Sequence, residues 1–461
     1  MIRRTFLAAT CAAVTLIAAP VAVTLRAQVA TAATRLSLRD ALRTADLHAY
    51  VNRAAAAGAD ATRAQSDGAL RGVLPGLSAE AGVVRTTDPI GAFGFALKQR
   101  SVSQASFAPQ SLNDPAGITN YGAGLVLEQP LVNADAWMGI RAARSTTDAT
   151  SAGARWTATT VRTDVVKAYY GAIVARELSR TMMAAEKSAR EHVRSAESAA
   201  ANGFVTRSDA LLARVRAGEV TVQRLEAESR ERIARASLAV LLGIPGDTSF
   251  SLPDLLPSPA DVIAKVPQPA ASQDRDDVKA AHETSKAARF DLRRAQGTLL
   301  PRVNGSARYD WNSPSRIGGG SPAWTVGAVA SWSVFGGGRE LADTRGAAAR
   351  LRVAAAQAEG AEAHAALQRQ SADEAFSVAL QRSAIADTAM TQSGEALRIV
   401  RRKYDGGLAT VSELLAAAAA DTQVRLMLAD ARYRVIVATA SRLQAWGADP
   451  GALAALDPDL R

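Results

Sequence analysis

The chain has 461 residues, of which 5% are aromatic and 21% charged, and its formal net charge is +10 at pH 7. So few aromatic side chains argue against a thick globular core, although this length is enough for several domains. The basic residues alternate with acidic ones along helical stretches, which is typical of solvated helix faces, so no nucleic-acid partner is expected.

The first 32 residues have the pattern of a secretory signal peptide. Two arginines, Arg3 and Arg4, precede an apolar stretch from Thr5 to Leu25 that contains no acidic residue. The sequence Ala30-Thr31-Ala32 fits the small-x-small cleavage rule, which places the mature start near Ala33. An earlier cut after Ala30 and an uncleaved membrane anchor are the alternatives.

The mature protein is expected to contain no cysteine, because Cys11 lies inside the apolar stretch of the signal, in the wrong context for a lipoprotein cleavage site. No disulfide or thiol chemistry is therefore expected. Removal of the signal takes away three arginines and no acid, which leaves a charge of +7. After residue 32 no apolar run approaches the roughly 20 residues that a spanning helix needs, so any membrane insertion is expected to be by strands.

The rest of the chain is an internal duplication. Four landmarks recur in the same order, and they pair residues 73–77 with 299–303, 124–133 with 327–336, 203–212 with 407–415, and 242–243 with 446–447. The first pair is 226 residues apart and the others 203 or 204, so the first half carries about 23 additional residues. This difference places an extra loop near Asp88 to Ile118.

Each half is predicted to run helix, strand, loop, strand, very long helix, glycine turn and helix. Asn133 to Asn202 contains no proline, and as a helix it would be roughly 105 Å long at about 1.5 Å per residue. Arg339 to Asp405 is nearly as long. The shorter helices predicted at Leu36 to Arg71 and Phe204 to Leu242 would pair end to end with one long helix. Apolar spacings of three and four predict a coiled-coil seam that includes Val165, Tyr169, Ala172 and Ile173.

Between the halves, Ile244 to Gln273 contains six prolines, which predicts a linker lying across the helices and not another long helix. The expected organisation is a signal peptide at 1–32, a first structural repeat at 33–243, a Pro-rich equatorial linker at 244–275, a second structural repeat at 276–447 and a C-terminal tail at 448–461.

Strands are predicted at 77–87, 120–128, 302–312 and 324–334. In the third, apolar and small residues alternate with Asn304, Ser306, Arg308, Asp310 and Asn312. In the fourth, Trp324 and Trp332 are about 26 Å apart at about 3.3 Å per residue, close to the apolar band of about 25 Å in outer-membrane barrels. Four aromatic residues are therefore expected to face lipid, namely Tyr309, Trp311, Trp324 and Trp332. A soluble sheet with one buried face would give the same alternation.

Four strands per chain cannot close a barrel, and open strand edges are not tolerated in lipid. A pore would therefore be shared between copies. Two copies would give eight strands and an interior packed with side chains, whereas three would give twelve strands and a lumen, which transport favours. The predicted fold class is thus mainly α with a membrane β-barrel.

The duplicated order, with Gln129-Pro130-Leu131-Val132-Asn133 before the long helix and Asp209 or Glu413 with paired leucines after the glycine turn, resembles the TolC-type outer membrane efflux family over about 36 to 447. The resemblance implies a homotrimer in the outer membrane, whose 12-strand barrel continues as a periplasmic α-helical barrel. It also implies a tripartite efflux or secretion system with a periplasmic adaptor and an inner-membrane pump. The alternative is a periplasmic coiled-coil adaptor or scaffold, which would show one helical hairpin instead of two.

The two glycine turns would form the periplasmic tip. The resemblance implies that the adaptor docks there, on Gly203, Phe204, Val205, Thr206, Gly407, Leu408, Ala409 and Thr410. Asp209 and Glu413 either cap the following helices together with the preceding threonines or form an entrance gate. Family members carry a second acidic residue three positions after the one that matches Glu413, but this chain has Ala416. A strong double acidic gate is therefore not expected.

No catalytic, cofactor or metal site is expected. None of the four histidines, His48, His192, His282 and His364, forms the His-Glu-x-x-His spacing that places two zinc ligands on one helix face. The glycine runs Gly318–Gly320 and Gly336–Gly338 lack the Lys-Ser/Thr of a phosphate-binding loop, and no Gly-x-Ser-x-Gly motif occurs. The chain is predicted not to be an enzyme.

Overall fold

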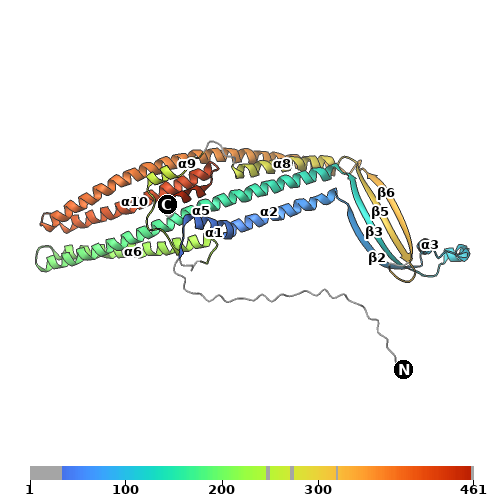
Figure 1. Ribbon diagram of the computed structural model, residues 1–461, viewed down its shortest axis with the longest axis horizontal. Coiled ribbons are helices and arrows are strands. Elements are labelled where there is room, and N and C mark those ends of the chain that lie inside the picture. Colours follow the sequence, from blue (N-terminus) through green and yellow to red (C-terminus); the bar gives the residue numbers. More distant parts are fainter. Residues whose placement is uncertain (1–33, 246–249, 270–274, 318–319, 458–461) are drawn as a thin grey trace, which may run out of the picture.

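The computed structural model describes residues 34–245, 250–269, 275–317 and 320–457. The expected signal peptide, residues 33, 246–249 and 270–274, part of the glycine run at 318–320 and the last four residues lie outside this part. The molecule is elongated, with an antiparallel sheet near one end and long helices extending from it to the other end (Figure 1). This arrangement agrees with the expected mainly helical fold.

Four helices make up most of the length. They are α5 (Ala134–Ala201, 68 residues), α6 (Arg207–Leu241), α9 (Arg339–Asp405, 67 residues) and α10 (Val411–Ala445). At about 1.5 Å per residue, α5 and α9 are each about 100 Å long. Among the residues described, no helix is long and apolar enough to cross a membrane.

The long helices pack through alanine. Alanine favours the helix and lets two helix backbones approach closely. In α9 the buried alanines are four or seven residues apart, which is the heptad spacing of a coiled coil, at Ala347, Ala354, Ala358, Ala365, Ala372, Ala379 and Ala386. This packing explains how a chain with few aromatic residues forms an extended helical structure.

The first short helix is broken in two, α1 (Leu38–His48) and α2 (Tyr50–Ala69), so the prediction of one helix from 36 to 71 was wrong. The backbone leaves the helical conformation at Ala49, where ψ is 127°. A Cβ on Gly243 would lie 2.1 Å from the His48 carbonyl oxygen, so the end of α6 packs directly against the break. No glycine or proline marks this position in the sequence, because tertiary packing determines it.

An equatorial cluster of buried apolar side chains lies about halfway along the helices. It gathers α1, the middle of α5, the ends of α6 and α10, and the Pro-rich stretch, which contains β4 (Phe250–Ser251) and α7 (Pro259–Lys265). The short strand β1 (Thr34–Arg35) pairs in parallel with β4. The seam residues Val165, Tyr169, Ala172 and Ile173 are buried here. The C-terminal turn η3 (Pro450–Leu456) also packs into this cluster through Leu453 and Leu456.

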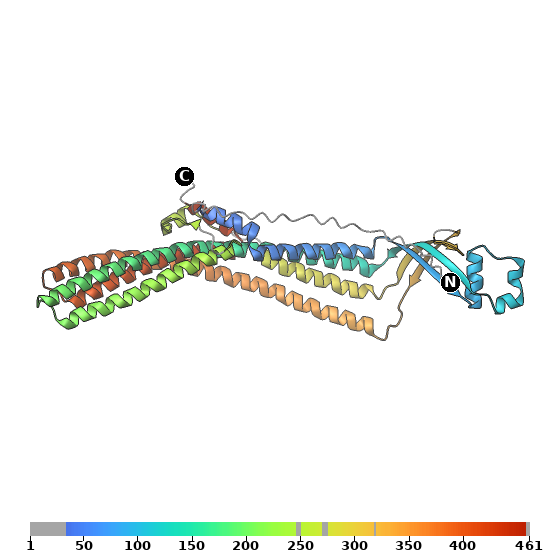
Figure 2. The ribbon, with the colours of Figure 1, turned by 90° about the horizontal axis from the view of Figure 1, so that it is seen from below.

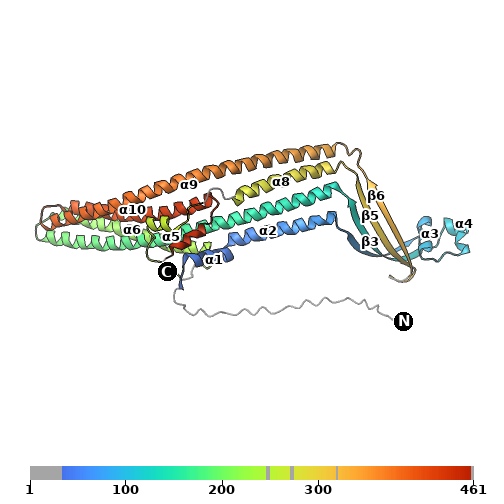
Figure 3. The same cartoon turned by 45° about the horizontal axis from the view of Figure 1, so that its top comes forward.

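On the sheet side of this cluster, α9, α8 (Asp276–Gly297), α5 and α2 lie side by side in that order (Figure 3). On the other side, the hairpins α5–α6 and α9–α10 extend together to the tip (Figure 2). In each half, two shorter helices therefore pack along one long helix. These are α2 and α6 along α5, and α8 and α10 along α9. The long helices connect the two ends of the molecule directly.

The main sheet has the strand order β2-β3-β5-β6, and every neighbouring pair is antiparallel. Its strands are β2 (Gly76–Thr86), β3 (Ile118–Val132), β5 (Arg302–Ser313) and β6 (Ser321–Ser331). The additional residues of the first half lie between β2 and β3, where they form α3 (Pro89–Lys98), η2 (Gln104–Phe107) and α4 (Pro109–Asn113).

The strand ends differ from the prediction by up to four residues, and two of these differences have a clear cause. β6 ends at Ser331, whose partner Arg302 is the first residue of β5 and follows Pro301. Because proline has no N–H to donate, the ladder stops there and Trp332 lies beyond the strand. β3 extends past residue 128, since it pairs with β5 as far as Val132, with a register shift at Pro130.

Candidate functional site

The register sorts the side chains of the sheet onto two faces. Leu125, Tyr309 and Trp324 are successive cross-strand partners on β3, β5 and β6, and partners point to the same side. Their face extends over all four strands, and its one charged residue is Arg85, close to the end of β2. The other members that we use here are Leu77, Ala79, Ala81, Val83, Tyr121, Ala123, Leu125, Leu127, Val303, Gly305, Ala307, Tyr309, Trp311, Trp324, Val326, Ala328 and Ala330. We call it the apolar face.

Much of the apolar face is exposed in the single chain. Leu77 is 70% exposed and Trp324 73% exposed, and the Tyr309 and Trp311 rings lie edge to face at 4.6 Å between centroids. Trp332, the fourth predicted lipid-facing aromatic residue, lies outside the sheet and donates from Nε1 to the Leu299 carbonyl at 3.0 Å. A contiguous exposed apolar surface of this size is rare on soluble monomers and is typical of an interaction site.

The opposite face of the sheet is polar. Arg308 on β5 forms ion pairs with Asp310 at 2.8 Å and with Glu80 on β2 at 3.3 Å, so this network extends across β3. A Cβ on Gly124 of β3 would lie 2.6 Å from the Asp310 Oδ1, so glycine leaves the space that the network occupies. A face with paired charges and small residues is suited to water.

A chain of amide side chains lies on the polar face at the end of the sheet remote from the long helices. Gln99, which follows α3, donates from Nε2 to the Asn120 Oδ1 at 3.0 Å and to the Thr119 carbonyl at 2.9 Å. Asn120 in turn donates from Nδ2 to the Asn312 Oδ1 at 2.8 Å. All three amide side chains are buried. These contacts were not expected from the sequence, because their members are up to 213 residues apart.

At the other end of the molecule, the two glycine turns have the same backbone geometry. In the first, Phe204 N donates to the Ala199 carbonyl at 2.9 Å and Gly203 N to the Ala200 carbonyl at 3.1 Å, which is a Schellman motif. In the second, the N–H groups of Leu408 and Gly407 make the equivalent bonds at 2.7 and 3.0 Å. Gly203 and Gly407 have φ of +77° and +74°, a conformation that glycine adopts without strain.

The residues after each glycine turn form a reciprocal cap. Asp209 N donates to the Thr206 Oγ1 at 3.2 Å, and Thr206 N donates to the Asp209 carboxylate at 3.0 Å. Thr410 and Glu413 repeat both bonds at 3.2 and 2.9 Å. Each acid therefore satisfies a backbone donor at the start of its helix.

Two large apolar side chains at these turns are unpacked. Phe204 is 83% exposed and Leu408 is 82% exposed, although the residue at this place in a Schellman motif often packs back against its own helix. Val205 differs, because it packs against a small cluster of Ala196, Ala210, Ala213 and Val411 that joins the two hairpins. Ala409 is half-buried. The exposed apolar surface of the tip is thus concentrated at residues 204 and 408.

A pocket of about 320 Å³ lies between α5, α6, α9 and α10, and His192 is among its lining residues. Burial lowers the pKa of His192, and the positive charge of Arg401 acts in the same direction against a smaller opposite effect of Glu191. Other charged groups that line the pocket are Arg216, Glu219, Asp421 and Arg425. His192 is therefore held in its neutral form over a wider pH range than a solvated histidine.

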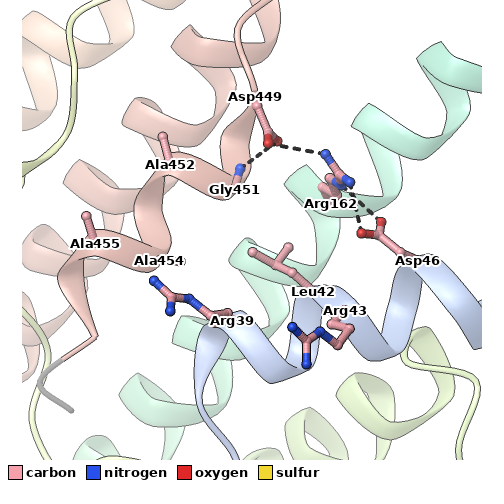
Figure 4. Close-up of a pocket in the computed structure, with 10 residues that line it drawn as sticks. All are labelled: Arg39, Leu42, Arg43, Asp46, Arg162, Asp449, Gly451, Ala452, Ala454 and Ala455. Carbon is pink, nitrogen blue, oxygen red and sulfur yellow. Dashed lines mark hydrogen bonds and ion pairs between the residues drawn. The ribbon is translucent and has the colours of Figure 1, made fainter. Parts of the chain in front are cut away.

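A second pocket, of about 700 Å³, lies between α1, α5 and η3, and Figure 4 shows its lining. Arg162 of α5 bridges Asp46 of α1 at 2.9 Å and Asp449 at 3.2 Å. The hydrogen bonds that Arg162 donates to Asp46 raise the pKa of Arg162 above its usual value, and Asp449 adds to this effect against desolvation. We interpret this arrangement as a clamp that ties the first helix and the C-terminal turn to the longest helix.

The four histidines lie on four different helices, α1, α5, α8 and α9. His282 on α8 contacts the Glu362 carboxylate of α9 at 2.7 Å, and both side chains are exposed. Within the described ranges, no group of three or more His, Cys, Asp or Glu side chains is arranged to hold a metal ion. The glycines Gly336 to Gly338 form the turn before α9.

A sequence model of the family described as outer membrane efflux protein matches residues 53–244 and 268–448, which is most of the chain and includes both halves. The chain belongs to this family. The resemblance drawn from the duplicated sequence pattern is thereby confirmed, and it places this outer membrane efflux protein in the outer membrane. The alternative of a periplasmic adaptor is not favoured.

Solved structures share the fold of this outer membrane efflux protein. The outer membrane protein VceC from Vibrio cholerae is 20% identical with a TM-score of 0.75, over 89% of this chain and 96% of that chain. The CmeC outer membrane channel of Campylobacter jejuni is 16% identical with a TM-score of 0.74, over 89% and 85%. The open state of the MtrE outer membrane channel of Neisseria gonorrhoeae is 19% identical with a TM-score of 0.71, over 90% and 89%. No curated protein matches the sequence.

Proposed function

We propose that three copies of this chain form one 12-strand barrel in the outer membrane, continued by a helical tunnel in the periplasm, and that the assembly is a passive conduit for efflux or secretion. The observation that carries this proposal is the sheet, which has one apolar face, one polar face and two edges, β2 and β6, without a second neighbour among the described strands. Membership in a family of efflux proteins supports a channel and not an enzyme.

The strand directions support closure by identical copies. Because every neighbouring pair is antiparallel, β2 and β6 of one chain run in opposite directions. When β6 of one copy pairs with β2 of the next, the new pair is again antiparallel. A ring of any number of copies therefore forms a barrel in which the strand direction alternates all the way round. Three copies would leave a lumen lined by the polar faces, with the apolar faces outward against lipid.

The helices support a continuous tunnel below the barrel. Four helices, α2, α5, α8 and α9, lie side by side under each sheet, so three copies would supply twelve. The connections are short, since β3 ends at Val132 and α5 begins at Ala134. A lumen bounded by the barrel would thus pass directly into the helical part.

We further propose that the tip binds a periplasmic adaptor, and through it an inner-membrane pump. Phe204 and Leu408 support this, because they are exposed apolar side chains at equivalent places and are suited to burial in a groove of a partner helix. The exposed Gly203, Thr206, Gly407 and Thr410 would surround them. We assign Asp209 and Glu413 to capping, since both acids are engaged by backbone N–H groups.

The experiment that tests the channel is a mass measurement of the purified protein in mild detergent, combined with conductance in planar bilayers. We expect three times the chain mass and ohmic channels of a single main conductance. A stable monomer, or a trimer without conductance, would contradict the proposal. Thr325→Pro is an informative variant, because it removes a backbone N–H from β6, the edge strand that would pair with β2 of the next copy. We expect it to prevent trimer formation.

A further inference from the structure

The charged side chains of the polar face lie in two places along the strands. Within the four strands of the sheet, this face carries Glu80, Glu128, Arg302, Arg308 and Asp310. Glu128 and Arg302 lie at the end of the sheet next to the helices, where Arg302 pairs with Asp135 of α5 at 2.6 Å. Glu80, Arg308 and Asp310 lie together near the middle of their strands. We call these three residues the charged row.

The charged row lies flat against the sheet. Glu80, Gly124 and Asp310 are successive cross-strand partners on β2, β3 and β5. Arg308 binds Asp310 beside it and reaches across β3 to Glu80. Gly124 makes this possible, because the Asp310 carboxylate occupies the space that a side chain on β3 would fill. The three side chains therefore extend along the wall of the proposed barrel and not toward its axis.

The charged row has an excess of negative charge. Two carboxylates share one guanidinium, so the row carries −1 per chain, while Glu128 and Arg302 cancel each other. The side chain of Glu80 is 57% exposed and that of Asp310 24% exposed, so solvent reaches both acids. In the proposed trimer, Glu80 lies at the contact with β6 of the next copy, and β6 contains no charged residue that could neutralise it. Three copies would thus carry three excess negative charges at one height of the lumen.

The dimensions of the proposed barrel let the charged row act on every solute that passes. Twelve strands about 4.8 Å apart and tilted by about 40° enclose a backbone cylinder of about 12 Å radius. Side chains narrow this further. The Debye length is about 10 Å at 0.1 M salt and about 3 Å at 1 M. At low salt, the field of the row therefore extends over the whole cross-section, whereas at high salt the axis is screened from it.

We propose that the charged row makes the barrel favour cationic over anionic solutes, with Glu80 and Asp310 as the determinants of this preference and Arg308 as the residue that limits it. This inference rests on the proposed trimer. Rings of acidic side chains favour cations in other pores. Because the row lies along the wall, it sorts solutes by charge without reducing the width that is open to them.

Reversal potentials of the purified trimer in planar bilayers, measured under a KCl gradient, test this inference. We expect the unchanged protein to prefer potassium over chloride. Glu80→Gln brings the row to zero charge and Arg308→Gln brings it to −2, so the permeability ratio of potassium to chloride should fall in the first variant and rise in the second. Each change should be about twofold or more at about 0.1 M salt and should shrink at about 1 M. Arg85→Gln is the matched control, because Arg85 lies on the opposite face of β2, and it should leave the ratio unchanged.

Thr325→Arg adds a charge without removing a member of the row. Thr325 is the cross-strand partner of Arg308 on β6 and faces the same side. We expect this variant to lower the permeability ratio in the same direction as Glu80→Gln, with the trimer mass unchanged.

Two results from a conducting trimer would overturn the inference and leave the channel proposal intact. One is the same permeability ratio in the unchanged protein, Glu80→Gln and Arg308→Gln, and the other is a preference of the unchanged protein for chloride. A monomer, or a trimer without conductance, would instead defeat the trimer proposal and this inference with it.

Discussion

At the scale of single residues, His192 makes the stability of the fold depend on pH. Its folded-state pKa is lowered by burial and by Arg401, so the unfolded chain binds a proton more readily than the folded one. The contribution of His192 to folding stability is therefore fully present above the unfolded-state pKa of about 6.5, and it is lost as the pH drops toward the lower folded-state pKa. We expect His192→Gln to reduce the loss of thermal stability between pH 7.5 and 5, measured by circular dichroism. His364→Gln, an exposed site on α9, is the control and should leave that loss unchanged.

The two faces of β6 offer a second test at this scale. Trp324 lies on the apolar face and the next residue, Thr325, on the polar face. A cation that faces lipid costs about 2–4 kcal/mol at mid-depth and less near the interfaces, whereas one that faces the lumen does not. We expect Trp324→Arg to lower the amount of assembled protein in outer-membrane fractions and Thr325→Arg to have little effect. Equal amounts of the two variants would contradict the assignment of the faces.

At the scale of elements, different residues of the tip are expected to support folding and adaptor binding. The Schellman bonds and reciprocal caps hold each turn through backbone groups and Thr206, Asp209, Thr410 and Glu413. We expect Phe204→Asp with Leu408→Asp to leave the trimer and its melting temperature unchanged while abolishing cross-linking to the adaptor. Asp209→Ala with Glu413→Ala should do the reverse, with a loss of about 0.5–2 kcal/mol per cap. Undiminished cross-linking of the Phe204/Leu408 double variant would end the docking proposal.

The long helices and the alternating strands were predictable because their signals are local and repeated. Heptad alanines, absent prolines and period-two alternation determine α5, α9 and β5 almost without tertiary context. The break at Ala49 and the end of β6 at Ser331 were not predictable, because each depends on a distant partner, Gly243 or Pro301. At the tip, the glycine turns and caps could be predicted from the sequence. The different exposure of Phe204 and Val205 could not, because it depends on how the two hairpins pack against each other.

At the scale of the whole molecule, the clamp at Arg162 joins the first helix to the C-terminal turn. The guanidinium is partly exposed, so its two ion pairs contribute modestly. We expect Arg162→Ala to destabilise the equatorial cluster by about 1 kcal/mol, seen as a lower melting temperature. Added salt should reduce the difference in melting temperature between this variant and the unchanged protein. Arg63→Ala, which removes an exposed pair on α2 alone, is the matched control. An identical shift for both variants would contradict the clamp.

The apolar face has a consequence for the life of a single subunit before assembly. A newly exported copy would carry this uncovered surface and two unpaired strand edges through an aqueous compartment, which is a combination that promotes aggregation. Assembly into the proposed trimer would depend steeply on concentration, whereas capture by a holding chaperone would not need a second copy. Slow synthesis would therefore lengthen the time during which an unassembled copy can aggregate. On this proposal the rate of export, and not only the stability of the finished channel, would influence how much functional protein a cell accumulates.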